Sequence, residues 1–282
     1  MRLMSVHAHP DDEASKGAAT VAKYVAEGHR VRIVTCTGGE RGSILNPRLV
    51  GDSSLTSRMP EVRRQEMDRA IAAIGAEHTW LGFIDSGLPE GDPPPPVPDG
   101  SFAALPLGVT VPVLVAELRS YRPHVVVTYN EEGGYPHPDH IMTHRVTMAA
   151  LDAAADPGYR PGLGEPWEVS KVYYDVSFSR RRLLAFHQAL VERGIESPFG
   201  DRLDGEWHER PVTARIDVAD WFPQRDDALR AHATQIDPDG FFFLMPRDLE
   251  RELWPWEEFE LARAAVPTRE LEESLFEGIE DD

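Results

Sequence analysis

The first thirteen residues, MRLMSVHAHPDDE (residues 1–13), decide the fold. The stretch from Arg2 to His7 predicts a buried strand, and Pro10 with the acids after it ends that strand in a polar turn. A helical pattern from Ser15 to Glu27 follows the turn. In open parallel sheets the ligand binds outside the carboxyl ends of the strands. This strand–turn–helix unit therefore predicts a binding site at its turn.

The rest of the first half repeats the alternation of short β-branched runs with amphipathic helical stretches. This alternation predicts an α/β protein with a Rossmann-like, mostly parallel sheet, helices on both faces and a smaller C-terminal α/β extension. We expect residues 1–155 to form the catalytic core and residues 156–282 to complete the sheet and the substrate cleft, within one continuous domain. The expected strands are Arg2–His7, Arg30–Cys36, His78–Phe83, His124–Tyr129, Lys171–Val176 and Val212–Asp217, and the expected helices are Ser15–Glu27, Glu61–Ile74, Val109–Ser120, Arg180–Arg193 and Phe222–Gln235.

Two long segments interrupt this pattern, and each directly follows an expected strand. They are Thr37–Thr56 and Ile84–Gly108, both rich in Gly, Pro, Asp and Ser. Long insertions at the carboxyl ends of parallel strands usually build a site, so we expect both to border the ligand. The acidic tail from Glu272 to Asp282 is expected to be frayed.

Composition excludes several classes of partner. The chain has 282 residues and a net charge of −19, which repels nucleic acid and anionic membranes. Cys36 is its single cysteine, so it has neither an internal disulfide nor a thiolate cluster for a metal. The polar N-terminus lacks the apolar stretch of a signal peptide, and no apolar run is long enough to span a membrane. We expect a soluble, cytoplasmic protein.

Two clusters of His and Asp follow two different expected strands. The first is HAHPDDE at residues 7–13, and the second is YPHPDH at residues 135–140. Asp11 or Asp12 alone could simply cap the following helix. That explanation accounts neither for the adjacent acids, which repel one another without a cation nearby, nor for His7 and His9.

The two clusters together predict a metal site. Catalytic zinc takes three His or carboxylate ligands and leaves one position open, and His9, Asp12 and His140 would supply such a set. His144 is a rival ligand because it lies four residues after His140 on an expected helix. A structural zinc site would require a fourth protein ligand. Zn²⁺ is the expected ion, one per chain, with Fe²⁺ as its competitor.

The segments AHPDDE (residues 8–13) and HPDH (residues 137–140) resemble the LmbE-like zinc deacetylases, also called the N-acetylglucosaminyl-phosphatidylinositol de-N-acetylase family. The resemblance implies zinc binding by His9, Asp12 and His140. It also implies that Asp11 is the general base, that His137 acts as an acid or electrostatic stabiliser, and that Tyr135 lies near the oxyanion. Asp139 is expected to orient His137.

Within this family the chain resembles the branch that cleaves the glucosamine-to-cysteinyl amide of mycothiol S-conjugates, a detoxifying reaction. The similar runs begin at Lys16 (KGAATVAKYVAEGH), His78 (HTWLGFIDSGLPEGD), Gly133 (GGYPHPDH) and Arg225 (RDDALRAHATQIDP). The alternatives are deacetylation of N-acetylglucosaminyl-inositol by the same groups and, more distantly, a non-hydrolytic nucleotide-binding protein. Against the latter, the first turn has no G-x-G-x-x-G loop.

The same resemblance implies contacts with the substrate. Lys16 would donate to the cysteinyl part, although without the resemblance an exposed helix lysine is the simpler interpretation. Arg63 would hold inositol hydroxyls, since a guanidinium donates several hydrogen bonds at once. Glu40, Arg41 and Asp85 are expected on loops that face the sugar, and each could equally form a surface ion pair.

Overall fold

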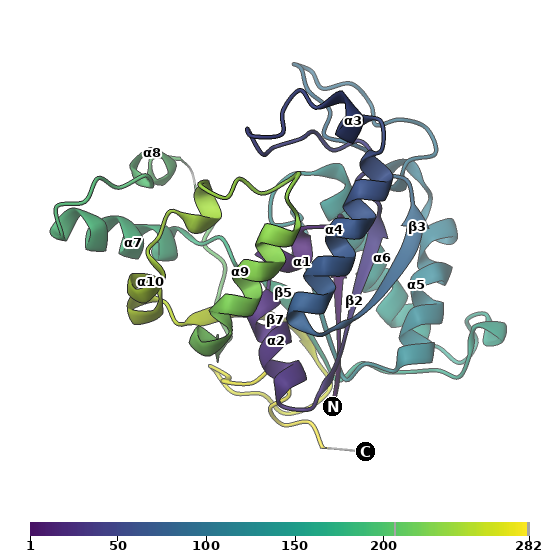
Figure 1. Ribbon diagram of the computed structural model, residues 1–282. Coiled ribbons are helices and arrows are strands. Elements are labelled where there is room, and N and C mark those ends of the chain that lie inside the picture. Colours follow the sequence, from purple (N-terminus) through teal and green to yellow (C-terminus); the bar gives the residue numbers. More distant parts are fainter. Residues whose placement is uncertain (206, 281–282) are drawn as a thin grey trace.

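A computed structural model describes residues 1–205 and 207–280 and contains one seven-stranded sheet (Figure 1). Its strand order is β3-β2-β1-β4-β5-β7-β6, in which β1 to β5 are parallel and β7 runs antiparallel to both of its neighbours. The strands are β1 (Arg2–His7), β2 (Arg30–Thr37), β3 (Glu77–Phe83), β4 (Val125–Thr128), β5 (Lys171–Asp175), β6 (Ala214–Asp217) and β7 (Trp256–Ala264). Both expected halves of the chain therefore contribute to the same sheet.

Helices cover both faces of the sheet (Figure 1). The helices α2 and α4 pack with α9 on one face, α5 and α6 pack on the other, and α7, α8 and α10 form a lobe beside the sheet. The α-helices are α1 (Asp12–Ser15), α2 (Ala18–Ala26), α3 (Ser53–Thr56), α4 (Met59–Ile74), α5 (Leu107–Tyr121), α6 (Pro138–Ala155), α7 (Arg180–Glu192), α8 (Gly200–Leu203), α9 (Phe222–Ala231) and α10 (Arg247–Leu253). Short 3₁₀ turns are η1 (Phe102–Ala104), η2 (Pro161–Leu163), η3 (Ala219–Trp221) and η4 (Phe241–Phe243). No helix in the described ranges is both long and apolar enough to cross a membrane.

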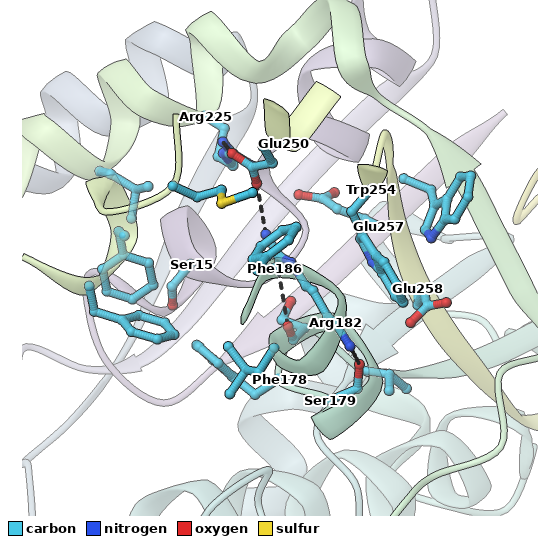
Figure 2. A pocket seen from close by; sticks show the side chains of 18 of the residues that line it. Ser15, Phe178, Ser179, Arg182, Phe186, Arg225, Glu250, Trp254, Glu257 and Glu258 are labelled. Atoms are coloured by element: carbon cyan, nitrogen blue, oxygen red, sulfur yellow. Dashed lines mark hydrogen bonds and ion pairs between the residues drawn. The ribbon is translucent and has the colours of Figure 1, made fainter. Parts of the chain in front are cut away.

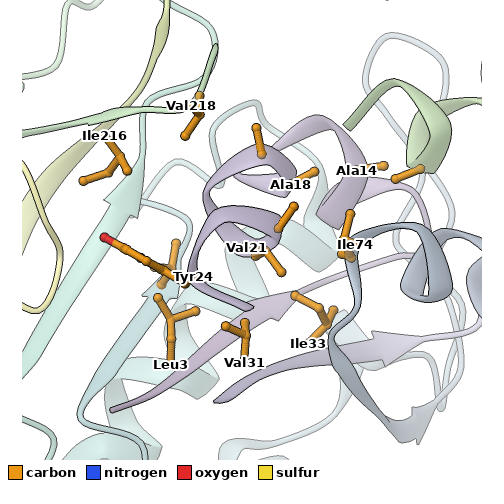
Figure 3. Packing of buried hydrophobic residues seen from close by; sticks show 14 of the residues in the cluster. Leu3, Ala14, Ala18, Val21, Tyr24, Val31, Ile33, Ile74, Ile216 and Val218 are labelled. Carbon is orange, nitrogen blue, oxygen red and sulfur yellow. The ribbon is translucent and has the colours of Figure 1, made fainter. Parts of the chain in front are cut away.

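Alternating side chains of the strands fill two cores. In β1, Leu3 points to the core under α2, α4 and α9, while Met4 points to the core under α5 and α6 (Figure 3). The same alternation places Ile33 and Val34 of β2 on opposite faces. A strand buried on both faces explains why these segments contain near-continuous apolar runs.

The order of the strands fixes the location of the site. The chain moves outward from β1 through β2 to β3, and then returns to the other side of β1 with β4 and β5. The carboxyl ends of β1 and β4 therefore diverge into loops that leave a crevice between them, which is the usual ligand site of an open α/β sheet. Both His/Asp clusters follow these two strands.

The expected α/β class and mostly parallel sheet are confirmed, but several elements differ from the expected ones. Strand β7 and helix α10 were not predicted. The single helix expected from Ser15 to Glu27 is broken, because Gly17 adopts a φ of 89° between α1 and α2. The helix expected to reach Gln235 ends at Ala231.

The prediction of a frayed acidic tail is wrong for residues 272–280. Glu272 is buried, accepts hydrogen bonds from Lys171 and Tyr173 of β5, and forms a parallel bridge with Ala214 of β6. Phe276 packs into the core beside Tyr24 of α2. The tail is ordered because Lys171 pairs with Glu272 and the hydrophobic core packs around Phe276, and both partners are remote in sequence. Asp281 and Asp282 lie outside the described residues.

We expect Lys171→Met to lower the free energy of unfolding by about 3–5 kcal/mol, because it leaves the buried carboxylate of Glu272 without its cation. Urea denaturation measures the change. Arg269→Met is the matched control, since Arg269 pairs with Glu277 in the same tail but is exposed. We expect a change within about 0.5 kcal/mol for the control. Equal stabilities of the two variants would contradict a structural role for the buried pair.

Candidate metal centre and active-site cavity

His9, Asp12 and His140 converge between β1 and β4, with one potential ligand atom from each lying within 4.8 Å of the other two. Oδ2 of Asp12 lies 3.5 Å from Nδ1 of His9 and 3.3 Å from Nε2 of His140. It also accepts the backbone N–H of His9 at 2.9 Å. All three residues are buried. We call these three residues the metal cluster.

His140 is held so that one of its nitrogens faces the metal cluster. Its Nδ1 lies 3.0 Å from the carbonyl oxygen of Gly133, which can only accept, so Nδ1 carries the proton and Nε2 has a free lone pair. Tyr129 stacks on the ring at 4.4 Å. Gly133 has a φ of 77°, and a Cβ there would lie 2.6 Å from Cβ of His140, so this position requires glycine.

His9 is oriented by carboxylates on its other side. Its Nε2 lies 3.2 Å from Asp139 and 3.5 Å from Asp85, which leaves Nδ1 turned toward Asp12. Asp139 is fully buried and also accepts hydrogen bonds from the backbone and hydroxyl of Ser86. A carboxylate behind a ligating histidine fixes the ring and raises its basicity.

The expectation that Asp139 orients His137 is corrected by these contacts. The carboxylate of Asp139 bonds to His9 and Ser86, and Asp139 reaches His137 through its backbone N–H, which donates to Nδ1 at 3.1 Å. The proline at position 138 starts α6 and places this N–H in the first turn of the helix, where it has no intrahelical acceptor. Asp139 therefore acts on the proposed ligand His9.

The electrostatics of the site fit a divalent cation. Burial lowers the pKa of His9, but hydrogen bonds to Asp12, Asp139 and Asp85 raise it well above its usual range. Within the described part of the chain, Nε2 of the buried His140 has no hydrogen-bond partner. Three buried carboxylates around two imidazoles, one with an unused lone pair, form a donor set suited to zinc.

Asp11 lies beside the metal cluster in a strained conformation. Its φ of 111° is in the left-handed region, where non-glycine residues are rare and often functional. Burial and the neighbouring Asp12 raise its pKa, while Arg63 opposes the rise from 3.2 Å. Its side chain is still partly accessible and lines the cavity. A carboxylate with a raised pKa that can reach solvent is suited to accept a proton.

Glu13 and His232 stabilise the turn that contains Asp11. Oε2 of Glu13 accepts the backbone N–H of Asp11 at 3.0 Å, and Oε1 lies 2.5 Å from Nε2 of His232. Both side chains are fully buried, and each shifts the pKa of the other toward the charged form against the effect of burial. His232 follows α9, so the second half of the chain fixes the backbone of Asp11.

His137 and Tyr135 lie beside the metal cluster, with the His137 ring centre 4.6 Å from that of His9. Burial and the nearby His9 and His140 lower the pKa of His137 to about 4, so its ring is neutral at pH 7. Because Nδ1 accepts the N–H of Asp139, the proton of the neutral ring lies on Nε2. The Tyr135 ring lies 4.5 Å from the ring of His140, and burial raises the pKa of its hydroxyl. Both side chains therefore offer hydrogen-bond donors.

A cavity of about 680 Å³ opens beside the metal cluster, and we call it the active-site cavity. Asp11, Asp12, Lys16 and Tyr135 line it. Lys16 is only 7% exposed, so the interpretation as a surface lysine is wrong. Its Nζ donates to Oδ1 of Asp12 at 2.7 Å and lies 5.9 Å from the centre of the Phe178 ring.

In the described structure, the other residues predicted to contact the substrate lie outside the lining of the active-site cavity. Arg63 is 2% exposed, and its guanidinium contacts the backbone oxygens of Pro10 and Gly39 as well as Asp11. Asp85 accepts the backbone N–H of Arg41 at 2.9 Å, and Glu40 accepts that of Asp85 at 3.1 Å. These residues join the two long loops to each other and to His9. Contacts of Arg63, Glu40, Arg41 and Asp85 with a sugar remain predictions.

Two other histidines near the site have separate partners. Nδ1 of His144 lies 3.0 Å from the backbone oxygen of Tyr129, and its ring faces Tyr174, outside the metal cluster. His7 is buried with Nε2 2.8 Å from the hydroxyl of Ser5, and burial lowers its pKa to about 4. Neither belongs to a group that could hold a metal among the described residues.

Sequence reasoning missed four residues at the site: Tyr129, Ser86, His232 and Phe178. Tyr129 is the last residue of an expected strand, and this position at the carboxyl end of a strand was a usable signal. Ser86 and Phe178 lie in loops with no motif. The partner of His232 is Glu13, 219 residues away, so only the fold brings them together.

Two imidazoles, several carboxylates and a cavity lie where β1 and β4 of this Rossmann-like sheet diverge. This is the architecture of a metal-dependent hydrolase. The chain belongs to the PIG-L family, described as GlcNAc-PI de-N-acetylase, whose model matches residues 4–151. A mycothiol S-conjugate amidase of Streptomyces coelicolor is 54% identical over 100% of this chain and 98% of its own length. A 1D-myo-inositol 2-acetamido-2-deoxy-alpha-D-glucopyranoside deacetylase of Geodermatophilus obscurus is 42% identical, over 99% and 98%.

The fold also resembles that of N,N'-diacetylchitobiose deacetylase from Pyrococcus horikoshii, with a TM-score of 0.62 and 16% identity over 92% of this chain and 83% of that one. The chain is therefore an enzyme that hydrolyses carbon–nitrogen bonds of amides. The non-hydrolytic alternative finds no support among these relatives.

Proposed function

We propose that this enzyme uses zinc to hydrolyse the amide that joins glucosamine to the S-substituted N-acetylcysteine of mycothiol conjugates. The products would be glucosaminyl-inositol and a mercapturic acid, which fits a role in detoxification. The observation that carries the proposal is the metal cluster, whose Asp12 lines the active-site cavity next to Asp11. The full-length similarity to an enzyme of that name supports the choice of substrate.

In this mechanism His9, Asp12 and His140 would hold the zinc ion, and Asp139 and Gly133 orient the two imidazoles. Zinc would supply Lewis-acid activation of a water molecule and of the scissile carbonyl. Asp11 accepts the proton of the attacking water. His137, through its Nε2–H, and Tyr135, through its hydroxyl, donate to the oxyanion. Asp11 returns the proton to the amine nitrogen as the carbon–nitrogen bond breaks.

The test is a comparison of kcat/KM for a mycothiol bimane conjugate and for N-acetylglucosaminyl-inositol with the zinc-loaded enzyme. We expect the conjugate to be the better substrate. A higher kcat/KM for N-acetylglucosaminyl-inositol would overturn the proposal in favour of deacetylation, the second candidate function, which the 42% identical deacetylase favours.

Lys16→Ala is expected to lower kcat/KM for the conjugate at least roughly 10-fold more than for N-acetylglucosaminyl-inositol. The reason is the loss of a charge-assisted hydrogen bond, worth about 1.5–3 kcal/mol, to the cysteinyl part that only the conjugate contains. Any loss common to both substrates reports the contact between Lys16 and Asp12. Lys23→Ala is the control, because Lys23 donates to the backbone of Asp217 away from the cavity. Equal losses on both substrates would contradict the cysteinyl contact.

A further inference from the structure

Part of the active-site cavity is lined by aromatic side chains that have no role in the proposed hydrolysis. Phe178 follows β5, and Phe241 and Phe242 form the start of η4. Their ring centres lie 5.5–6.3 Å apart, so the three rings form one continuous surface. We call these three residues the aromatic wall. Phe178 is 44% exposed, an unusual exposure for a phenylalanine next to catalytic groups.

The aromatic wall begins close to the reacting groups. Nζ of Lys16 lies 2.7 Å from the carboxylate of Asp12 and 5.9 Å from the centre of the Phe178 ring. A substrate that reaches Asp12 with its scissile amide and passes Lys16 therefore arrives at the aromatic wall within a few bonds. Elsewhere the same cavity is lined by polar side chains, among them Asn130, Glu132 and Arg210. The cavity thus offers one apolar and one polar environment.

A smaller hollow of about 60 Å³ continues behind the aromatic wall into the lobe of α7 and α10 (Figure 2). Phe186, Met245 and Trp254 line it, together with the charged residues Arg182 and Glu250. The carboxylate of Glu250 accepts hydrogen bonds from Arg182, Arg225 and Arg247 and is already fully engaged. This carboxylate is therefore not free to bind a polar ligand.

We propose that the aromatic wall binds the S-substituent of the conjugate and makes the enzyme prefer apolar, especially aromatic, substituents. The inference rests on the proposed function, and it deepens that function by naming the part of the substrate that the enzyme discriminates. The sulfur substituent lies on the cysteinyl side of the scissile amide, on the side where Lys16 is expected to bind. Covering exposed phenylalanine rings with an apolar group removes apolar surface from water and favours binding.

The test compares kcat/KM for an S-benzyl conjugate, an S-methyl conjugate and N-acetylglucosaminyl-inositol. For Phe178→Ala we expect the S-benzyl conjugate to lose roughly 10-fold or more, the range for removing an apolar contact in a pocket, with the other two substrates within about 2-fold. Phe178→Leu should show a smaller loss in the same direction. Equal losses on all three substrates, or no loss on the S-benzyl conjugate, would overturn the proposal.

Phe243→Ala is the matched control. Phe243 belongs to η4 like Phe241 and Phe242, but it lines neither the active-site cavity nor the smaller hollow, and the guanidinium of Arg230 lies 4.8 Å from its ring centre. We expect this variant to keep the wild-type preference for the S-benzyl conjugate. A thermal melt of each variant separates loss of folding from loss of selectivity.

A second readout distinguishes failure of this inference from failure of the proposed function. If the wild-type enzyme hydrolyses only N-acetylglucosaminyl-inositol, the proposed function fails. The wall is then tested by inhibition of that reaction with N-acetyl-S-benzylcysteine and N-acetyl-S-methylcysteine. Stronger inhibition by the benzyl compound, weakened roughly 10-fold in Phe178→Ala, supports an apolar subsite. Equal inhibition by the two compounds overturns it.

Discussion

Asp11→Asn is expected to retain the metal ion and to lose about 10²- to 10⁴-fold in kcat, the usual contribution of a general acid–base group. Asparagine has nearly the same shape, tolerates the positive φ of this position, and can still accept a hydrogen bond from Arg63. It cannot take a proton from the attacking water. Metal content by elemental analysis and kcat on the preferred substrate measure the two effects separately.

The matched control is Asp12→Asn, the same change one residue further along the chain. Asp12 faces His9 and His140, so we expect this variant to lose most of its metal along with its activity. If Asp11→Asn loses metal and Asp12→Asn retains it, the proposed base and ligand are exchanged. Full activity of Asp11→Asn would remove the base from the mechanism.

His140→Ala is expected to lose most of its bound metal and nearly all activity while keeping its fold. Its Nε2 lacks a hydrogen-bond partner among the described residues and faces Asp12, so its removal deletes one of three proposed ligands. The two hydrophobic cores, one on each face of the sheet, do not include this side chain. Elemental analysis of the purified variant, with circular dichroism to check the fold, measures the outcome.

His144→Ala tests the rival ligand on the same helix. His144 lies one turn after His140 on α6, but its Nδ1 is paired with the backbone of Tyr129. We expect this variant to keep its metal. Full metal occupancy in His140→Ala, or loss of metal in His144→Ala, would show that the ligand set has been assigned to the wrong turn of the helix.

The predicted strands and the placement of the two His/Asp clusters depend on local pattern. β1 and β4 are short apolar runs that end in polar turns, and the order of a parallel α/β sheet brings their carboxyl ends together. The structure therefore brings His9, Asp12 and His140 together, as expected.

The missed elements depend on partners that are distant in sequence. β7 carries three glutamates, Glu257, Glu258 and Glu260, and its antiparallel partners β5 and β6 lie far from it in the sequence. The tail looks disordered by composition, but Lys171 neutralises Glu272 across 101 residues. Local propensity contains no information about such partners.

The same limit applied within the site. Asp139 lies two residues after His137 in the sequence and was expected to orient it. The start of α6 turns the Asp139 carboxylate toward His9 and Ser86, which come from two other loops. Lys16 looked like an exposed helix residue, and the break at Gly17 instead buries it against Asp12.

The bond between Glu13 and His232 limits how this enzyme can be recombined with its relatives. All proposed metal ligands and the proposed base lie before residue 156, which suggests a portable catalytic half. Yet Glu13, and likewise Glu66 through Thr234, is a buried carboxylate whose partner comes from the other half of the chain. A chimera joined near residue 155 would take its metal ligands from one parent and the partners of Glu13 and Glu66 from the other. Only parents that both conserve the Glu13–His232 and Glu66–Thr234 pairs would therefore yield an active chimera.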